Sequence, residues 1–359
     1  MSPMFRYADR LLDWYDSNHR QLPWRASPGA PLAEPYRVWL SEIMLQQTTV
    51  ATVGPYFEKF IDRWPTVVAL AAAELDEVLT AWAGLGYYAR ARNLHRCAQV
   101  VATDHQGKFP PTETELRELP GIGPYTAAAI TAIAFGQRAT VVDGNVERVV
   151  ARLFAVEEQL PKAKSALWEL ADGLTPNARA GDYAQAVMDL GATVCRPRGP
   201  LCSECPVMDA CTGRLTGNVE SYPRRVAPKP KPKRLGTAFW LRRADGKVLL
   251  RRRPDKGLLA SMIEVPSSPW VESDQIDEII LEHAPTSCEW RAIDGQVRHT
   301  FTHFHLALDL MVGQISDDQT VETTDPSAQI WADPHDLDGY ALPTVMKKVV
   351  RLALAESET

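Results

Sequence analysis

The stretch Leu119–Val146 reads LPGIGPYTAAAITAIAFGQRATVVDGNV, and it decides the fold of the first half of the chain. It holds a turn containing Gly121 and Gly123, then an apolar run, then Asp143. Glycine permits a tight turn and a close approach of the backbone to a ligand. Pro124 suits the first turn of a helix, where free N–H groups make a site for one phosphate. The turn alone is equally typical of a connection between two core helices.

Length and composition indicate a globular protein with two domains. The chain has 359 residues, of which 45% are hydrophobic, enough for two separate cores. No apolar run approaches the ~20 residues that a membrane span needs, and the N-terminal MSPMFRYADR lacks the apolar segment of a signal peptide. We therefore expect a cytoplasmic protein that does not enter a membrane and whose cysteines are not disulfide-bonded.

The charge of the chain is unevenly distributed. A net charge of −6 argues mildly against a nucleic-acid partner. However, residues 224–256 are rich in Lys and Arg, with only Asp245 and Asp255 as acids, whereas residues 272–338 are strongly acidic. A basic stripe beside an acidic lobe can still follow a phosphate backbone, and the alternative is an ordinary solvated surface.

The hydrophobic pattern changes along the chain. It is helical up to about residue 213, with apolar residues recurring at spacings of three and four. We predict a helical domain over residues 1–217, a stiff extended linker rich in Pro and Lys over 218–234, and an α+β domain over 235–359. In the last domain we expect strands at 237–243, 247–252, 289–292, 297–313 and 328–332, and helices at 275–283 and 343–355.

A carboxylate on a predicted helix is the first candidate for chemistry. Residues 36–50, YRVWLSEIMLQQTTV, are predicted to form one helix. On it Glu42, Gln46 and Thr49 share a face, because they are spaced by four and three residues. Adjacent polar groups amid apolar residues are unusual for a solvent face, although a lone Glu on an amphipathic helix is usually just solvated.

Further segments resemble a known family. PWR at 23–25, WLSEIMLQQT at 39–48 and GLGYYARARNL at 84–94, with the glycine turn and Asp143, resemble the MutY family of adenine DNA glycosylases. This family lies within the helix-hairpin-helix DNA glycosylase superfamily. The resemblance covers residues 8–211 closely and the remainder weakly. It implies a multidomain protein with an all-α helix-hairpin-helix core and an α+β Nudix-like domain.

The resemblance implies roles for two carboxyl groups. Removing a base leaves positive charge on the sugar and needs a proton on the departing base, so one protonated and one ionised carboxyl group suit the reaction. Glu42 would be the general acid toward adenine N7, and Asp143 would stabilise the oxocarbenium-like sugar. Burial is expected to raise the pKa of Glu42. Arg25, Tyr125 and Asn145 match family positions that touch the base or orient the carboxylates.

The residue after the glycine turn bears on the type of reaction. The lyase branch of the superfamily carries a Lys where this chain has Tyr125, and that Lys attacks the sugar. We therefore expect a monofunctional glycosylase that leaves an abasic site. The adenine must be flipped out of the duplex. Gln47 and Tyr87 match the family's intercalating positions, and Gln46 is assigned with them to contact DNA. Without the resemblance, Gln47 and Tyr87 would be ordinary loop and helix surface.

Four cysteines form a second candidate site. Cys195, Cys202, Cys205 and Cys211 have the spacing C-x6-C-x2-C-x5-C. Zinc sites usually use two closely spaced pairs, whereas this segment has one. The spacing matches the [4Fe-4S] loop of the glycosylases, so we favour that cluster over zinc or free thiols. Its expected role is local folding and DNA docking.

The C-terminal domain carries a candidate lesion-reading loop. Phe301, Thr302 and His303 resemble the family's Phe-Ser-His loop, which contacts 8-oxoguanine; an alternative is a strand with solvent-facing imidazoles. Residues 257–266, GLLASMIEVP, depart from the usual family pattern, and the clustered glutamates of a Nudix hydrolase are missing. We expect this domain to bind and not to hydrolyse.

The favoured function is removal of adenine from double-stranded DNA containing A:8-oxoguanine or A:G mispairs, by a monomeric enzyme of base excision repair. A glycosylase/lyase for oxidised pyrimidines is the second hypothesis, disfavoured by Tyr125 and Glu42. A non-catalytic, lesion-binding iron–sulfur protein is the third, and the presence of both carboxyl groups argues against it.

Overall fold

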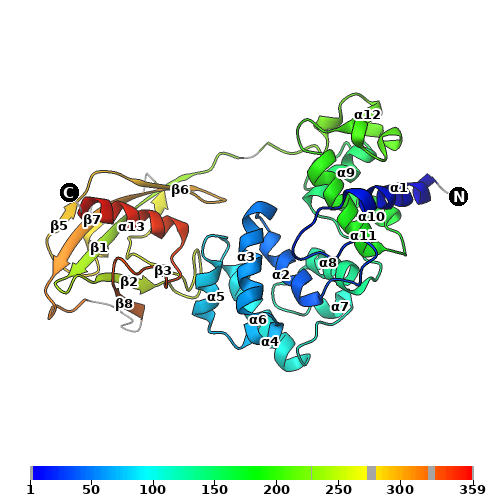
Figure 1. Ribbon diagram of the computed structural model, residues 1–359. Helices are drawn as coiled ribbons and strands as arrows, with labels where there is room; N and C mark the ends of the chain where they lie inside the picture. The colour runs from blue at the N-terminus through cyan, green and yellow to red at the C-terminus, as the bar shows by residue number, and fades with distance from the viewer. Residues whose placement is uncertain (1–2, 228, 273–279, 322–327, 358–359) are drawn as a thin grey trace. The chain divides into compact units, whose positions relative to one another are not determined.

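The computed structural model describes residues 3–227, 229–272, 280–321 and 328–357 (Figure 1). They divide into two compact units. The first contains residues 1–72 and 93–228, and the second contains residues 73–92 and 229–359. The multidomain organisation, with a helical core and a sheet-containing part, is as the sequence predicts.

The first unit is helical. Its α-helices are α1 (Pro3–Asn18), α2 (Pro35–Leu45), α3 (Val50–Arg63), α4 (Val67–Ala71), α6 (Ala89–Asp104, which begins in the other unit), α7 (Glu113–Leu116), α8 (Pro124–Phe135), α9 (Gly144–Leu153), α10 (Lys164–Leu174), α11 (Ala180–Asp189) and α12 (Thr212–Leu215). A π-helical turn, η1 (Leu190–Val194), continues α11, and short 3-10 turns occur at Cys202–Glu204, Met208–Ala210 and Val219–Ser221.

Helix α8 is the buried centre of this unit. Pro124 occupies its first turn, and Gly136, with φ of 65°, ends it. Residues 126–134 are buried on every side, because α8 packs against α2 on one side and α11 on another. Close packing against α11 depends on Gly181, since a Cβ atom there would lie 2.5 Å from the Ala132 carbonyl oxygen.

The single helix predicted for residues 36–50 is wrong. Helix α2 ends at Leu45, and Gln47 adopts a positive φ of 60°. A new helix, α3, then starts because the Thr49 side chain accepts a hydrogen bond from the Thr52 N–H. Threonine is a favoured residue at this capping position. A local cap thus overrides the helical periodicity.

The second unit is built on a mixed sheet. Its strands are β1 (Lys233–Arg243), β2 (Val248–Arg252), β3 (Ile263–Glu264), β4 (Val271–Glu272), β5 (Trp290–Ala292), β6 (Val297–Thr300), β7 (His305–Ile315) and β8 (Gln329–Ala332). The path β3-β2-β1-β7-β5 is joined by β4 on β1, β6 on β7 and β8 on β2. Strands β1 and β7 run parallel, with Lys233 opposite His305, and the other pairs are antiparallel.

Helix α13 (Thr344–Ser357) closes the core of this unit. Val345, Met346 and Val349 pack with Trp240 and other sheet residues. The predicted strand at 297–313 is instead a hairpin, in which residues 301–304 turn between β6 and β7. Most of the helix predicted at 275–283 lies outside the described residues, and Ile280–His283 forms a 3-10 turn.

Residues 73–92, including helix α5 (Leu75–Trp82), contact the sheet of the second unit. Arg252 donates to both carboxylate oxygens of Asp76, at 2.8 and 2.6 Å. Arg92 donates to the Ala260 carbonyl oxygen at 2.6 Å. These contacts attach a helical segment of the sequence to the C-terminal half of the chain.

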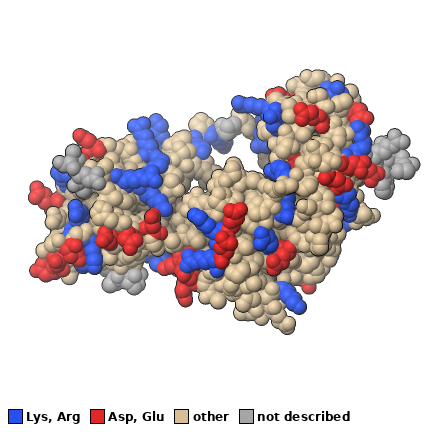
Figure 2. Space-filling model, in the orientation of Figure 1, with Lys and Arg blue, Asp and Glu red and all other residues tan. Residues whose placement is uncertain are grey.

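Many arginines of the basic stripe are paired. Figure 2 shows both signs of charge on the visible face. Arg251 and Arg253 both bind Glu264, which is 1% exposed, and Arg243 binds Asp245. The stripe is therefore less positive than the sequence pattern indicates. No helix within the described residues is long and apolar enough to cross a membrane.

We predict that Gly181→Ala destabilises the helical unit by about 1–3 kcal/mol, because the added methyl group overpacks the α8–α11 contact. Gly144→Ala is the matched control, since nothing lies within 4 Å of a Cβ atom there. Chemical unfolding of both variants measures the difference. Equal stability of the two variants would show that the contact relaxes without cost.

Candidate active site

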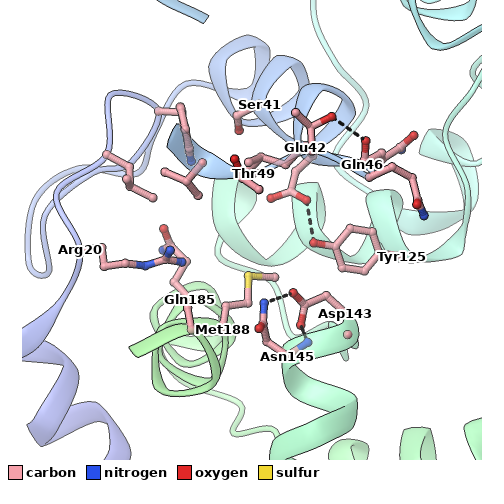
Figure 3. Close-up of a pocket in the computed structure, with 18 of the residues that line it drawn as sticks. Arg20, Ser41, Glu42, Gln46, Thr49, Tyr125, Asp143, Asn145, Gln185 and Met188 are labelled. Atoms are coloured by element: carbon pink, nitrogen blue, oxygen red, sulfur yellow. Dashed lines mark hydrogen bonds between the residues drawn. The ribbon is translucent and has the colours of Figure 1, made fainter. Parts of the chain in front are cut away.

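The predicted catalytic residues meet around one pocket of the helical unit. Its volume is about 960 Å³, within the range of ligand-binding clefts. Helices α2, α8, α9 and α11 contribute side chains to it (Figure 3). The residues it brings together include Arg25, Glu42, Gln46, Gln47, Tyr125, Asp143 and Asn145. Gly121, Gly123, Tyr87, the loop 301–303 and the four cysteines do not line it.

Glu42 on α2 is buried, with 7% of its surface exposed. Burial raises the pKa of Glu42 to about 7, because the charged form loses its hydration. The Tyr125 hydroxyl donates to Oε2 of Glu42 at 2.8 Å, and this hydrogen bond lowers the pKa of Glu42. The nearby Asp143 charge raises that pKa. Near neutral pH, Glu42 therefore exists in both protonation states.

Asp143 is fixed at the start of α9. As the N-cap, its Oδ1 accepts hydrogen bonds from the backbone N–H groups of Asn145 and Val146, at 2.8 and 2.7 Å. Oδ2 accepts from the Asn145 side-chain amide at 2.8 Å. Three converging donors fit the ionised carboxylate, which only accepts hydrogen bonds. Glu42 and Asp143 thus occupy different environments in one pocket.

Arg25 is held by a partner that the sequence did not reveal. Its Nη1 lies 2.8 Å from both carboxylate oxygens of Asp189, which is 0% exposed. Arg20 donates to the same carboxylate through its side chain and its backbone N–H. The ion cluster places Arg25 close enough to Glu42 to favour the charged form of that carboxyl group.

Helix α11 supplies further pocket residues that the sequence interpretation missed. Gln185 is 5% exposed, and its amide nitrogen donates to the Gly181 carbonyl oxygen at 3.2 Å. Within the described part of the chain, its amide oxygen has no hydrogen-bond partner. Met188 lies between Gln185 and Asn145 in Figure 3. The available signal is a polar pair, Gln185 and Asp189, spaced by four on a mostly apolar helix.

Asn145 connects the pocket to the cysteine segment through Arg148. Arg148 donates to Asn145 Oδ1 at 2.8 Å, to the Gly191 carbonyl oxygen at 2.6 Å and to the Cys195 carbonyl oxygen at 2.8 Å. Gly191 lies in the π-helical turn, and a Cβ atom there would be 2.6 Å from Asn145 Cβ. The position of Asn145 therefore depends on this tight packing.

The glycine turn has the geometry that its sequence predicts. Gly121 has a φ of 78°, and a Cβ atom there would lie 2.8 Å from Asn93 Cβ. Gly123 is the N-cap of α8, carries no side-chain cap and is exposed. In the described part of the chain, no side chain therefore caps the start of α8, which leaves its first N–H groups free of a capping partner, as a phosphate site requires.

The candidate DNA-contacting residues differ in their surroundings. Gln46 donates to the Thr126 hydroxyl at 3.3 Å. Gln47 is exposed and has a positive φ of 60°. Tyr87 is 46% exposed, with a φ of 49°. Positive φ is unfavourable for residues with a side chain and persists where surrounding structure enforces it. The side chains of Gln47 and Tyr87 therefore project from tight turns of the backbone.

In the second unit, the 301–304 turn presents only its tip to solvent. Phe301 stacks on Phe304 with ring centroids 4.7 Å apart and anchors the turn. Thr302 and His303 are exposed. The Tyr87 and Thr302 hydroxyl groups lie 2.6 Å apart, so two predicted DNA-contacting residues that are distant in sequence meet within this unit.

Two of the four cysteine thiol groups contact a buried arginine. Arg152, 1% exposed, donates to Cys195 Sγ at 3.3 Å, and Cys211 Sγ donates to its carbonyl oxygen at 3.4 Å. Burial raises the pKa of Cys205 to about 11, and repulsion from the other three thiolates adds to it. Among the described residues, no three His, Cys, Asp or Glu side chains are arranged to hold a single metal ion.

Comparison with known proteins agrees with this architecture. Residues 40–173 match the HhH-GPD superfamily of base excision DNA repair proteins, and residues 237–352 match the NUDIX domain. Adenine DNA glycosylases from Homo sapiens and Mus musculus are 37% and 36% identical, covering 96% of this chain and 73% and 77% of their own lengths. A thermostable thymine-DNA glycosylase structure, 31% identical, covers 59% of this chain and 97% of its own, with a TM-score of 0.54.

The helical fold and its pocket define a helix-hairpin-helix DNA glycosylase with a C-terminal Nudix-like domain. The chain belongs to the adenine DNA glycosylase family.

We predict that Glu42→Gln stabilises the protein above neutral pH. Since the pKa of Glu42 is raised from 4.5 to about 7, ionising it costs more in the folded than in the unfolded state. The cost is absent below pH 4.5 and grows to about 3 kcal/mol above pH 7. Unfolding measurements at pH 5 and pH 8 test this, with exposed Glu118→Gln as control. Equal effects of Glu42→Gln at both pH values would contradict a raised pKa.

Proposed function

We propose that this protein removes adenine mispaired with 8-oxoguanine or guanine, by hydrolysis of the N-glycosidic bond in base excision repair. The family assigns the enzyme class. The observation that carries the mechanism is the buried Glu42, with a pKa raised to about 7, in one pocket with the hydrogen-bonded Asp143.

Glu42 acts as the general acid. Its protonated form transfers a proton to N7 of the departing adenine, which turns the base into a better leaving group. The raised pKa keeps a large fraction of Glu42 protonated near neutral pH. Tyr125 donates to one of its oxygens and so orients the carboxyl group.

Asp143 stabilises the sugar. As the C–N bond breaks, positive charge develops at C1′, and a nearby carboxylate with a fixed orientation lowers the energy of that transition state. The backbone and side-chain donors from Asn145 and Val146 hold Asp143 in place before the substrate arrives. Water then adds at C1′ and leaves an abasic site.

Gln185 supports adenine as the base in this pocket. Its buried amide oxygen accepts no hydrogen bond from the described residues. An unpaired buried acceptor is costly, and the exocyclic amino group of adenine is a donor that satisfies it. We assign Gln185 to the recognition of that amino group.

A monofunctional reaction is supported by the residues of the pocket. Tyr125 provides no amine, and among the described residues lining the pocket Lys164 is the one lysine. Lys164 forms an ion pair with Glu147 at 3.2 Å, and an ammonium group is not a nucleophile. Strand cleavage by Schiff-base chemistry is therefore not expected.

Recognition of the mispair requires residues outside the pocket. Gln47, in its strained exposed turn, fills the space left by the flipped adenine, and Tyr87 inserts into the stack near the opposite base. Thr302 and His303 at the tip of the 301–304 turn contact 8-oxoguanine. The enzyme is proposed to act as a monomer in the cytoplasm.

The four cysteines fit a [4Fe-4S] cluster better than zinc. The spacing C-x6-C-x2-C-x5-C has one closely spaced pair, whereas zinc sites usually have two. Besides burial, the charges of Cys195, Cys202 and Cys211 all raise the pKa of Cys205, so the four thiol groups lie near one another. A cluster of several irons is larger than one zinc ion and is held by Cys thiolates alone. Cys195, Cys202, Cys205 and Cys211 would hold it, and Arg152 donates to Cys195 Sγ. When bound, the cluster supplies a structural cross-link for the loop.

Single-turnover base release tests the function. We expect adenine release from duplexes with 8-oxoguanine or guanine opposite adenine, little release opposite thymine, and strand breaks only after alkali. Strand breaks without alkali would support a lyase instead. Tight binding to the 8-oxoguanine duplex with no release at all would support a lesion-binding protein.

We predict that the rate of adenine release falls about tenfold per pH unit above pH 7, because Glu42 loses its proton there. Glu42→Gln abolishes release and retains DNA binding. Tyr125→Phe removes a hydrogen bond that lowers the pKa of Glu42, so the decline moves to higher pH. A rate that stays constant between pH 7 and 9 would rule out Glu42 as the acid.

We predict that Thr302→Val lowers the preference for 8-oxoguanine over guanine about tenfold, by removing one discriminating hydrogen bond. Thr302→Ser keeps the hydroxyl group and is the matched control. The ratio of single-turnover rates at subsaturating enzyme measures the preference. If the two variants behave alike, the hydroxyl group does not read the lesion.

A further inference from the structure

The mouth of the pocket carries two cations whose role the base-removal chemistry does not explain. Lys164 at the start of α10 and Arg225 near the end of the helical unit both line the pocket. The two residues are far apart in sequence, and neither takes part in the proton transfer. Both side chains are exposed.

Arg225 is brought to this place by backbone pairing. Leu160 and Arg225 form an isolated parallel bridge, and the Leu160 N–H donates to the Arg224 carbonyl oxygen at 2.9 Å. Upstream, the Tyr222 carbonyl oxygen accepts from buried Arg152 at 3.1 Å, and the Tyr222 hydroxyl donates to Glu157 at 2.6 Å. Residues 222–225 are therefore fixed on α9 and on the α9–α10 connection.

Lys164 is held by a carboxylate that is itself mostly buried. Glu147 is 13% exposed and Lys164 is 63% exposed, and their charged atoms lie 3.2 Å apart. An ammonium group has three N–H donors, and an ion pair with one carboxylate oxygen leaves donors for another acceptor. Glu147 thus acts as a tether that keeps the ammonium group at the mouth of the pocket.

Among the residues that the structure describes, Arg225 has no anionic partner. Within the described residues its guanidinium makes neither an ion pair nor a hydrogen bond, and its positive charge acts on that of Arg148, whose pKa it lowers in part. A guanidinium group that lines a pocket without a counter-charge can bind an anion there. The N-terminus of α9 is not this anion site, because two of its backbone N–H groups already donate to the Asp143 side chain.

We propose that Lys164 and Arg225 bind the backbone phosphates next to the flipped adenosine, with Glu147 positioning Lys164. This inference rests on the proposed function, since the pocket must receive a nucleotide of a DNA strand. A base inside the pocket leaves its two flanking phosphates at the mouth, where the two cations lie. Phosphate contacts of this kind fix the position of a nucleotide without reading its sequence.

The test combines protein variants with modified DNA. Binding is measured for a duplex carrying a non-cleavable fluorinated deoxyadenosine opposite 8-oxoguanine, and for the same duplex with neutral methylphosphonates in place of the two flanking phosphates. Lys164→Ala, Arg225→Ala and Glu147→Gln are compared with wild type. Lys162→Ala is the control, because Lys162 is exposed two residues from Lys164 and does not line the pocket.

We expect Lys164→Ala and Arg225→Ala each to weaken binding about five- to tenfold on the natural backbone and to have little effect on the methylphosphonate duplex. The slope of the logarithm of the binding constant against the logarithm of the salt concentration should become shallower by about 0.9 for each lost phosphate contact. Glu147→Gln should show a smaller loss of the same kind, because Lys164 keeps its charge and loses its tether. Lys162→Ala should leave both quantities near the wild-type values.

Equal losses on the two backbones, or an equal loss in Lys162→Ala, would overturn the proposal and indicate a general effect of charge. Failure of the proposed function gives a different result, since the wild-type protein would then release no adenine from the natural duplex. If adenine release is normal and the variants bind like wild type, the phosphate assignment alone is wrong.

Discussion

The burial of Glu42 in a pocket that also contains Asp143 is the constraint on which the site depends. Removing a carboxyl group from water is unfavourable for its charged form, and a second carboxylate nearby adds to that cost. Glu42 therefore holds its proton up to a higher pH than an exposed carboxyl group does. Other enzymes that cleave glycosidic bonds also place their two carboxyl groups in different environments.

The architecture of the helical unit maintains this difference. Glu42 comes from α2, Tyr125 from α8, Asp143 from the cap of α9 and Gln185 from α11, so four helices must keep their relative positions. Small residues make the close contacts possible, above all Gly181 between α8 and α11 and Gly191 against Asn145. Through Arg148 the same contacts extend to the cysteine segment. Integrity of that segment is thus expected to influence the position of Asp143.

The sequence predicts which carboxyl groups share the pocket better than it predicts their surroundings. The glycine turn followed by Asp143 is a local pattern, whereas Glu42 stands out through the resemblance, which also implies the roles of both carboxyl groups. The break after Leu45 does not follow, because a threonine cap competes with a continuous apolar periodicity. The ion cluster of Arg25 with Asp189, and the pairing of Arg252 with Asp76, join residues that are far apart in sequence. Such contacts leave no local signal.

The expected 8-oxoguanine loop illustrates the same limit. Phe301, Thr302 and His303 were predicted together as DNA-contacting residues. The hairpin geometry separates them, since Phe301 packs on Phe304 while Thr302 and His303 are exposed. The alternation of apolar and polar residues that indicates a strand gives no sign of this turn. Similarly, Arg225 reaches the pocket through a backbone bridge to Leu160, which is far from it in sequence.

The most direct test of the account is an infrared titration of the Glu42 carboxyl group, taken as the difference between wild type and Glu42→Gln. The protonated carboxyl band should disappear with a midpoint near pH 7, as the raised pKa requires. A midpoint near the ordinary value of 4.5 would mean that Glu42 is ionised at neutral pH. It would then be unable to donate the proton on which the proposed reaction depends.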